Sequence, residues 1–144
     1  AQTHPIRIEM FAGPFREPEE FKSLTAKAIN GVRIRQYTKR FLDYLSAADL
    51  SISLAGYNTC MNLLAARVPA LIYPYSKQQE QPLRVSKINR FLPMKILHDK
   101  DIEPAVISRY ILEMLFESRP SEGVPINLAG AANTARYLKN WIGS

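Results

Sequence analysis

A short turn between an apolar segment and a helix-forming segment is the part of this sequence best suited to chemistry. Residues 49–54 are apolar with interleaved serines, residues 55–59 read Ala-Gly-Tyr-Asn-Thr, and residues 60–67 are rich in helix formers. The continuous apolar run at residues 70–73 is typical of a strand covered on both faces. This order predicts a strand–helix–strand unit with Gly56 in the turn. Helix ends of this kind bind phosphate through free N–H groups and the helix dipole, although many such turns only reverse the chain.

The amino-acid sequence of this stretch resembles that of a known family. The turn at 55–59, the pattern Leu-Leu-Ala-Ala-x-x-Pro-Ala at 63–70, a strand ending at Pro74 and the pair Glu80-Gln81 resemble the donor-binding half of two-domain (GT-B) glycosyltransferases. Family 28, which includes the peptidoglycan N-acetylglucosaminyltransferase, is the most similar group. A branch of predicted glycosyltransferases with the Gly-Tyr-Asn-Thr motif is more similar still. The resemblance runs from about residue 6 to residue 141. It implies a Rossmann-like domain that lacks its first β-α unit and its amino-terminal partner domain.

The resemblance assigns the turn to the diphosphate of a nucleotide-sugar, the expected substrate, through Gly56, Asn58 and Thr59. The alternative is that Asn58 or Thr59 only caps the helix. Asn62 stands where the family has a glutamate that binds both ribose hydroxyls. An amide cannot supply the two charge-assisted acceptors of a carboxylate, each worth about 1.5–3 kcal/mol. Asn62 is therefore a weakened ribose contact, or else a solvated polar residue on a helix.

Two further loops receive roles from the resemblance. Glu80 and Gln81 lie in the loop that contacts hydroxyl groups of the donor sugar, where carboxylates and carboxamides can bridge neighbouring hydroxyls. They could equally be plain polar loop residues. Tyr37 and Thr38 occupy the loop whose backbone contacts the base, which implies a UDP-linked sugar.

A basic helix face follows the sugar-binding loop. Arg84, Lys87 and Arg90 recur every three residues. They could attract a diphosphate or an anionic membrane surface, and the alternative is a solvated charged face. Of these, Arg84 is a secondary candidate for the site. His4 and His98 are isolated, with no cysteine or second histidine at ligand spacing, so no metal or other cofactor is expected.

Composition limits the classes of function. The 144 residues suit one domain, and 47% apolar with 22% charged residues is ordinary for a globular chain. The net charge of +6 is spread along the chain without a basic run, which argues against specific nucleic-acid binding. The single cysteine, Cys60, fits a reducing cytoplasm and is expected to be a buried, inert residue. No apolar run could span a bilayer, so we expect a cytoplasmic protein or one bound at the inner face of the membrane.

The elements that position these residues follow from periodicity. Strands are expected at 5–12, 32–35, 49–54, 70–73 and 94–97. Helices are expected at 18–29, after Thr38, and at 60–67, 79–91, 101–115 and 126–142, with Asp101 as a cap and a linker at 119–125. Alternating strands and helices predict an α/β fold with a parallel sheet flanked by helices, whose ligands bind outside the carboxyl ends of the strands.

Function is predicted from these features together. The chain is expected to be the nucleotide-sugar-binding portion of an inverting glycosyltransferase that transfers a hexosyl group to an acceptor. No general base is evident, and the family draws that group from the amino-terminal domain or the cleft beside it, so this chain alone should not be a competent transferase. A nucleotide-sugar hydrolase, a non-catalytic subunit or an interaction module on the same scaffold is the alternative.

Overall fold

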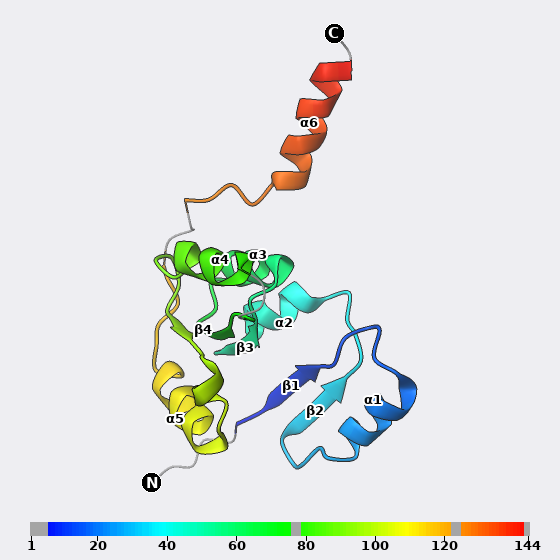
Figure 1. Ribbon diagram of the computed structural model, residues 1–144, viewed down its shortest axis with the longest axis vertical. Helices are drawn as coiled ribbons and strands as arrows, with labels where there is room; N and C mark the ends of the chain where they lie inside the picture. The colour runs from blue at the N-terminus through cyan, green and yellow to red at the C-terminus, as the bar shows by residue number, and fades with distance from the viewer. Residues whose placement is uncertain (1–5, 76–78, 122–124, 143–144) are drawn as a thin grey trace. The chain divides into compact units, whose positions relative to one another are not determined.

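The computed structural model describes residues 6–75, 79–121 and 125–142. Its backbone contacts divide the chain into two compact units, Ala1–Phe41 and Leu42–Ser144. The expected α/β fold with parallel strands flanked by helices is confirmed (Figure 1). All five predicted strands are present, but they pair as two parallel sheets, one of two strands and one of three.

The first unit is a strand–helix–strand motif. Strand β1 (Ile8–Phe11) pairs in parallel with β2 (Val32–Arg35), and α1 (Pro18–Thr25) connects them. Pro18 and two glutamates open α1, since proline lacks an N–H that would need a partner and acidic groups suit the positive helix end. Gly31 precedes β2 with φ +86°, and a Cβ there would lie 2.9 Å from the carbonyl oxygen of Ile6. Only glycine fits this turn.

The second unit contains the three-stranded sheet, in the order β3 (Ser51–Leu54), β4 (Ala70–Tyr73) and β5 (Met94–Ile96). Helix α2 (Phe41–Ala47) leads into it. Helices α3 (Tyr57–Ala66) and α4 (Glu80–Ile88) connect successive strands and lie side by side on one face of the sheet (Figure 1). Helix α5 (Pro104–Met114) contacts β4.

The central strand explains the core of this unit. Successive side chains of a strand point to opposite faces, and the first three residues of β4 are fully buried. Leu71 packs in a cluster with Leu97 and Met114, on the face that α5 covers. Ala70 and Ile72 therefore face the α3–α4 layer, where Leu63, Leu64 and Val85 are also buried. Coverage on both faces accounts for the unbroken apolar run of β4.

Two arginine side chains bind backbone carbonyl groups near the amino ends of these strands. Arg67 ends α3 in the left-handed conformation, with φ 54°, and its Nη1 donates to the carbonyl oxygens of Ser121 at 2.9 Å and Pro120 at 3.4 Å. Arg119 donates to the carbonyl oxygens of Ala66 and Ala48. Segment 119–121, the described start of the predicted linker, is therefore bound to the end of α3. Residues 122–124 of that linker lie outside the described residues.

Several predicted boundaries need correction. The expected 101–115 helix begins at Pro104 instead, with Glu103 as its cap, and Asp101 belongs to the short 3-10 helix η1 (Asp99–Asp101). Asp101 does not cap α5, because its carboxylate accepts the backbone N–H of His98 at 2.9 Å. The expected 126–142 helix is α6 (Gly130–Ile142), which has no buried residue in its described length. None of the helices in the described ranges combines the length and apolar character that crossing a membrane requires.

Candidate functional site

The turn at the carboxyl end of β3 has the geometry expected of a ligand-binding loop. Strand β3 ends at Leu54, Ala55 is fully buried and its N–H donates to the carbonyl oxygen of Tyr73, and Gly56 caps α3. The first hydrogen bond within α3 runs from the N–H of Cys60 to the carbonyl oxygen of Gly56, at 3.0 Å. The N–H groups of the preceding first turn have no partner inside the helix. They can donate to an anion at this end.

Helix α3 begins three residues earlier than predicted. Its first residue is Tyr57, so Asn58 and Thr59 lie in its first turn instead of before it. Gly56 is the cap, and no side chain makes a capping hydrogen bond. The alternative that Asn58 or Thr59 serves as the helix cap is therefore wrong. Asn58 is exposed and Thr59 is half-buried, so both stand at the helix end where the predicted diphosphate would lie.

Gly56 is not required for its backbone angles. Its φ of −60° and ψ of 152° are extended values that most residues adopt. A Cβ at this position would meet Thr59 Oγ1 at 3.7 Å, an ordinary contact. The absence of a side chain matters because it leaves the helix end open to a ligand.

Arg84 joins α4 to this turn, a connection that the sequence did not reveal. Its Nη1 donates to the carbonyl oxygen of Ala55 at 2.9 Å, and its guanidinium lies 5.5 Å from the ring centroid of Tyr57. The side chain therefore contacts the residues on both sides of Gly56. Only 19% of it is exposed, whereas Lys87 and Arg90 are exposed. The interpretation of all three as one solvated face is wrong for Arg84.

The start of α4 carries the two candidate sugar-binding residues. Glu80 is 90% exposed at its side chain and lies 3.6 Å from Arg84 Nη2. Gln81 is half-buried, and its Oε1 accepts the backbone N–H of Tyr75 at 2.9 Å. Glu80 and Gln81 are thus brought to the same sheet edge as the Gly56 turn, through Arg84 and through the end of β4.

The remaining predicted residues lie farther along α3 or in the first unit. Asn62 is half-buried one turn after Asn58, on the same side of α3. Tyr37 and Thr38 follow β2 in the first unit, where Tyr37 is 59% exposed and Thr38 Oγ1 accepts the N–H of Arg40 at 3.0 Å. This bond holds Thr38 in the turn that leads into α2.

Cys60 is fully buried in the fourth position of α3. Burial raises the pKa of its thiol, and the positive charge of Arg84 lowers this pKa to a smaller extent. A raised pKa leaves little thiolate at neutral pH, and thiolate is the nucleophilic form. The prediction that Cys60 is a buried, inert residue agrees with this environment.

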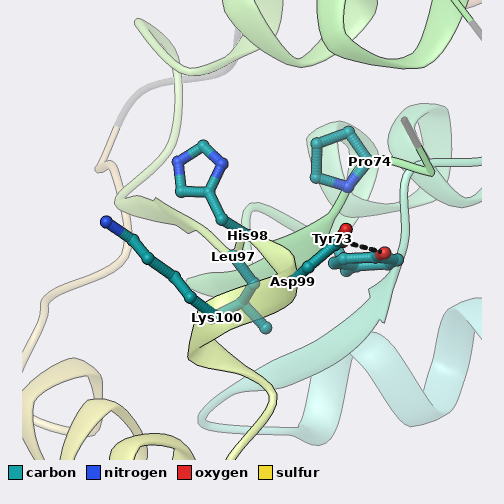
Figure 2. A pocket seen from close by; sticks show the side chains of 6 residues that line it. All are labelled: Tyr73, Pro74, Leu97, His98, Asp99 and Lys100. Carbon is teal, nitrogen blue, oxygen red and sulfur yellow. Dashed lines mark hydrogen bonds between the residues drawn. The ribbon is translucent and has the colours of Figure 1, made fainter.

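A shallow pocket of about 320 Å³ lies at the carboxyl ends of β4 and β5. The Tyr73 hydroxyl donates to Asp99 Oδ1 at 2.5 Å, and this bond raises the pKa of Tyr73 (Figure 2). The rule that ligands bind outside the carboxyl ends of parallel strands points to the loop after β5, but no chemistry is predicted for that loop from the sequence. The pocket is lined by Tyr73, Pro74, Leu97, His98, Asp99 and Lys100. Within the described residues, no group of three or more His, Cys, Asp or Glu side chains is placed to hold a metal ion.

Comparison with known proteins identifies a protein family for this chain. A search of curated proteins finds no match. The family model for the glycosyltransferase family 28 C-terminal domain matches residues 12–134. That span covers parts of both units and includes the Gly56 turn, the Glu80-Gln81 pair and Arg84. The chain therefore belongs to the glycosyltransferase family 28 C-terminal domain family.

Proposed function

We propose that this chain binds the nucleotide-sugar donor of an inverting glycosyltransferase, with UDP as the nucleotide and a hexose as the transferred group. The observation that carries the proposal is the open end of α3 behind Gly56, in a chain that belongs to family 28. The first-turn N–H groups and the helix dipole would bind the diphosphate, assisted by Asn58 and Thr59. The Gly-Tyr-Asn-Thr turn favours the corresponding branch of the family over the peptidoglycan enzyme.

The other predicted residues would contact the remaining parts of the donor, which are its ribose, sugar and base. Asn62 would make a single ribose contact, Glu80 and Gln81 would bind sugar hydroxyls, and the loop at Tyr37 and Thr38 would contact the base. In the transfer, the bond between the anomeric carbon and the diphosphate oxygen breaks as an acceptor oxygen forms a bond to the opposite face of that carbon. The released diphosphate gains negative charge, which the end of α3 is oriented to stabilise. An amino-terminal partner domain would bind the acceptor and supply the base that takes the proton of the acceptor.

An amide NMR titration tests this proposal. UDP should shift the amides of Gly56, Tyr57, Asn58 and Thr59 in a saturable manner. UDP-N-acetylglucosamine should additionally shift Glu80 and Gln81. A Thr59→Val variant should bind UDP more weakly while its spectrum keeps the native dispersion. The absence of any shift in the α3 amides at millimolar UDP, on the order of the weakest affinities of interest, would contradict the proposal.

A nucleotide-sugar hydrolase or a non-catalytic subunit is the second candidate, and Asn62 favours it. The loss of a carboxylate at the ribose position lowers donor affinity, which suits a protein that no longer carries out efficient transfer. The two functions are separated by incubating the whole protein with UDP-N-acetylglucosamine alone. Release of UDP and free sugar without an acceptor supports hydrolysis, and the absence of release counts against it. In the whole protein, Gly56→Val should abolish transfer if the first proposal holds.

A further inference from the structure

Arg84 makes the contacts of a residue that holds a ligand-binding turn in place. It is the fifth residue of α4, and the neighbouring Val85 is 1% exposed in the core. The backbone of α4 is thereby fixed against α3, which it contacts. From this fixed base, the side chain reaches the carbonyl oxygen of Ala55, 29 positions earlier in the chain, at 2.9 Å.

The bond is well suited to fixing the Gly56 turn. Ala55 is fully buried, so its carbonyl oxygen would lose a hydrogen-bond partner if Arg84 were removed. The same guanidinium lies over the ring of Tyr57, the first residue of α3. An arginine fork presents several donors in one plane and also stacks on aromatic rings, whereas a lysine offers a point charge on a flexible stem. One rigid group thus contacts the residues immediately before and after Gly56.

We propose that Arg84 is the positioning residue that keeps the Gly56 turn in its ligand-ready form and links it to the start of α4. The inference rests on the proposed donor-binding function: Arg84 acts through the turn, and its guanidinium also contacts the diphosphate once the donor is bound. Glu80 adds a second element, because its exposed carboxylate lies 3.6 Å from Arg84 Nη2. A diphosphate bound at α3 competes with this carboxylate for the guanidinium. Donor binding therefore releases Glu80, which becomes available to the sugar hydroxyls.

The first test needs no ligand. Amide hydrogen exchange of Cys60 reports the first bond of α3, to the carbonyl oxygen of Gly56. Arg84→Gln should raise this exchange rate about tenfold or more, because the turn loses its tether. Lys87→Gln is the matched control, since it removes the same charge from the same helix at an exposed position. It should leave the Cys60 rate within about twofold of wild type. Equal rates in the two variants would overturn the proposal.

The second test uses UDP and uridine as probes. Arg84→Gln should lower the affinity for UDP about tenfold or more and leave the affinity for uridine nearly unchanged, because the turn faces the diphosphate. Lys87→Gln should weaken UDP by no more than about threefold, through long-range charge alone. In Arg84→Lys, the Cys60 amide should exchange about as fast as it does in Arg84→Gln. Wild-type behaviour of Arg84→Lys in both measurements would mean that charge alone suffices, which would overturn the positioning role.

Glu80 provides the last comparison. Glu80→Gln should tighten UDP by about twofold to fivefold, because the competing carboxylate is gone, and should reduce the additional affinity gained from the sugar of UDP-N-acetylglucosamine. Weaker UDP binding by this variant would contradict the exchange of partners at Arg84. Failure of the wild-type chain to bind UDP would refute the proposed function. The Cys60 exchange rates would still decide whether Arg84 holds the turn.

Discussion

The side-chain carbonyl oxygen of Gln81 accepts a hydrogen bond from the backbone N–H of Tyr75, at 2.9 Å. This bond closes the connection between β4 and α4, in which residues 76–78 lie outside the described residues. The resemblance assigns Gln81 to the donor sugar, yet here one end of its carboxamide holds the loop. Toward a sugar, the N–H groups of the amide can donate to hydroxyl oxygens.

Gln81→Glu separates the two roles. A glutamate keeps an acceptor oxygen for the N–H of Tyr75 but has no N–H donors. The melting temperature should stay within a few degrees of wild type, since the lost interactions are small relative to domain stability. The ratio of UDP-N-acetylglucosamine affinity to UDP affinity, measured by calorimetry, should fall toward one. Gln81→Ala, which also loses the loop bond, is the control that should alter the Tyr75 amide signal.

Gly56→Ala tests the open helix end. The backbone angles suit alanine and the new Cβ meets only Thr59 Oγ1 at 3.7 Å, so the fold should survive with a loss of about 0.5–1 kcal/mol from the weaker cap. The methyl group would lie where the diphosphate approaches, so UDP affinity should fall about tenfold. Gly130→Ala is the matched control, because a Cβ there meets nothing within 4 Å. Unchanged UDP affinity in Gly56→Ala would place the diphosphate elsewhere.

Cys60 should resist alkylation in the native chain. Its thiol is fully buried and burial raises its pKa, so iodoacetamide should modify it at neutral pH about a hundredfold more slowly than the urea-unfolded chain. The measurement is the time course of the mass increase by intact-protein mass spectrometry. Rapid labelling under native conditions would show that the start of α3 opens frequently.

Much of the fold could be predicted from the sequence, and the reasons are local. The sequence predicts β4 at residues 70–73, the bounds found in the structure, because a buried parallel strand needs an unbroken apolar run. The start of α3 was predicted three residues late because Asn58 and Thr59 are good capping residues, whereas Gly56 caps without any side-chain bond. Capping preferences are statistical, and here the backbone alone closes the turn.

Long-range contacts account for what the sequence left open. The pattern of Arg84, Lys87 and Arg90 gives no reason to separate them, and only the carbonyl oxygen of Ala55 distinguishes Arg84. The apolar residues of α6 recur at helical spacing, yet Leu138 and Ile142 are 55% and 84% exposed. A period of 3.6 residues identifies an apolar stripe but does not specify the surface that covers it.

The bond between Tyr73 and Asp99 predicts an alkaline effect on stability. The bond raises the pKa of Tyr73 above its ordinary value of 10.0, so the folded chain holds this proton more tightly than the unfolded chain. The corresponding stability is complete below about pH 10 and is lost as the pH rises through the folded-state pKa. The stabilities of wild type and Tyr73→Phe in urea unfolding should therefore differ by a constant amount below about pH 10 and converge as the pH rises through the folded-state pKa. A difference that stayed constant through this rise would contradict the effect.

Arg67 allows backbone strain to be measured separately from its side-chain bonds. Arg67→Ala and Arg67→Gly both lose the hydrogen bonds to Pro120 and Ser121. Only glycine adopts φ 54° without a Cβ penalty, so the alanine variant should be less stable than the glycine variant by about 1 kcal/mol in urea unfolding. Equal stability of the two variants would mean that the end of α3 relaxes to ordinary angles.

The buried residues of the second unit are distributed unevenly along the chain, and this has a consequence for synthesis. Among the described residues, Met114 is the last that is buried, and α6 buries none. Every side chain of the core has thus been added before the ribosome reaches α6. Since domains fold as units while the chain is still growing, the three-stranded unit can complete its core during translation. Helix α6 is synthesised after this core and, in its described length, contributes no buried side chain to it.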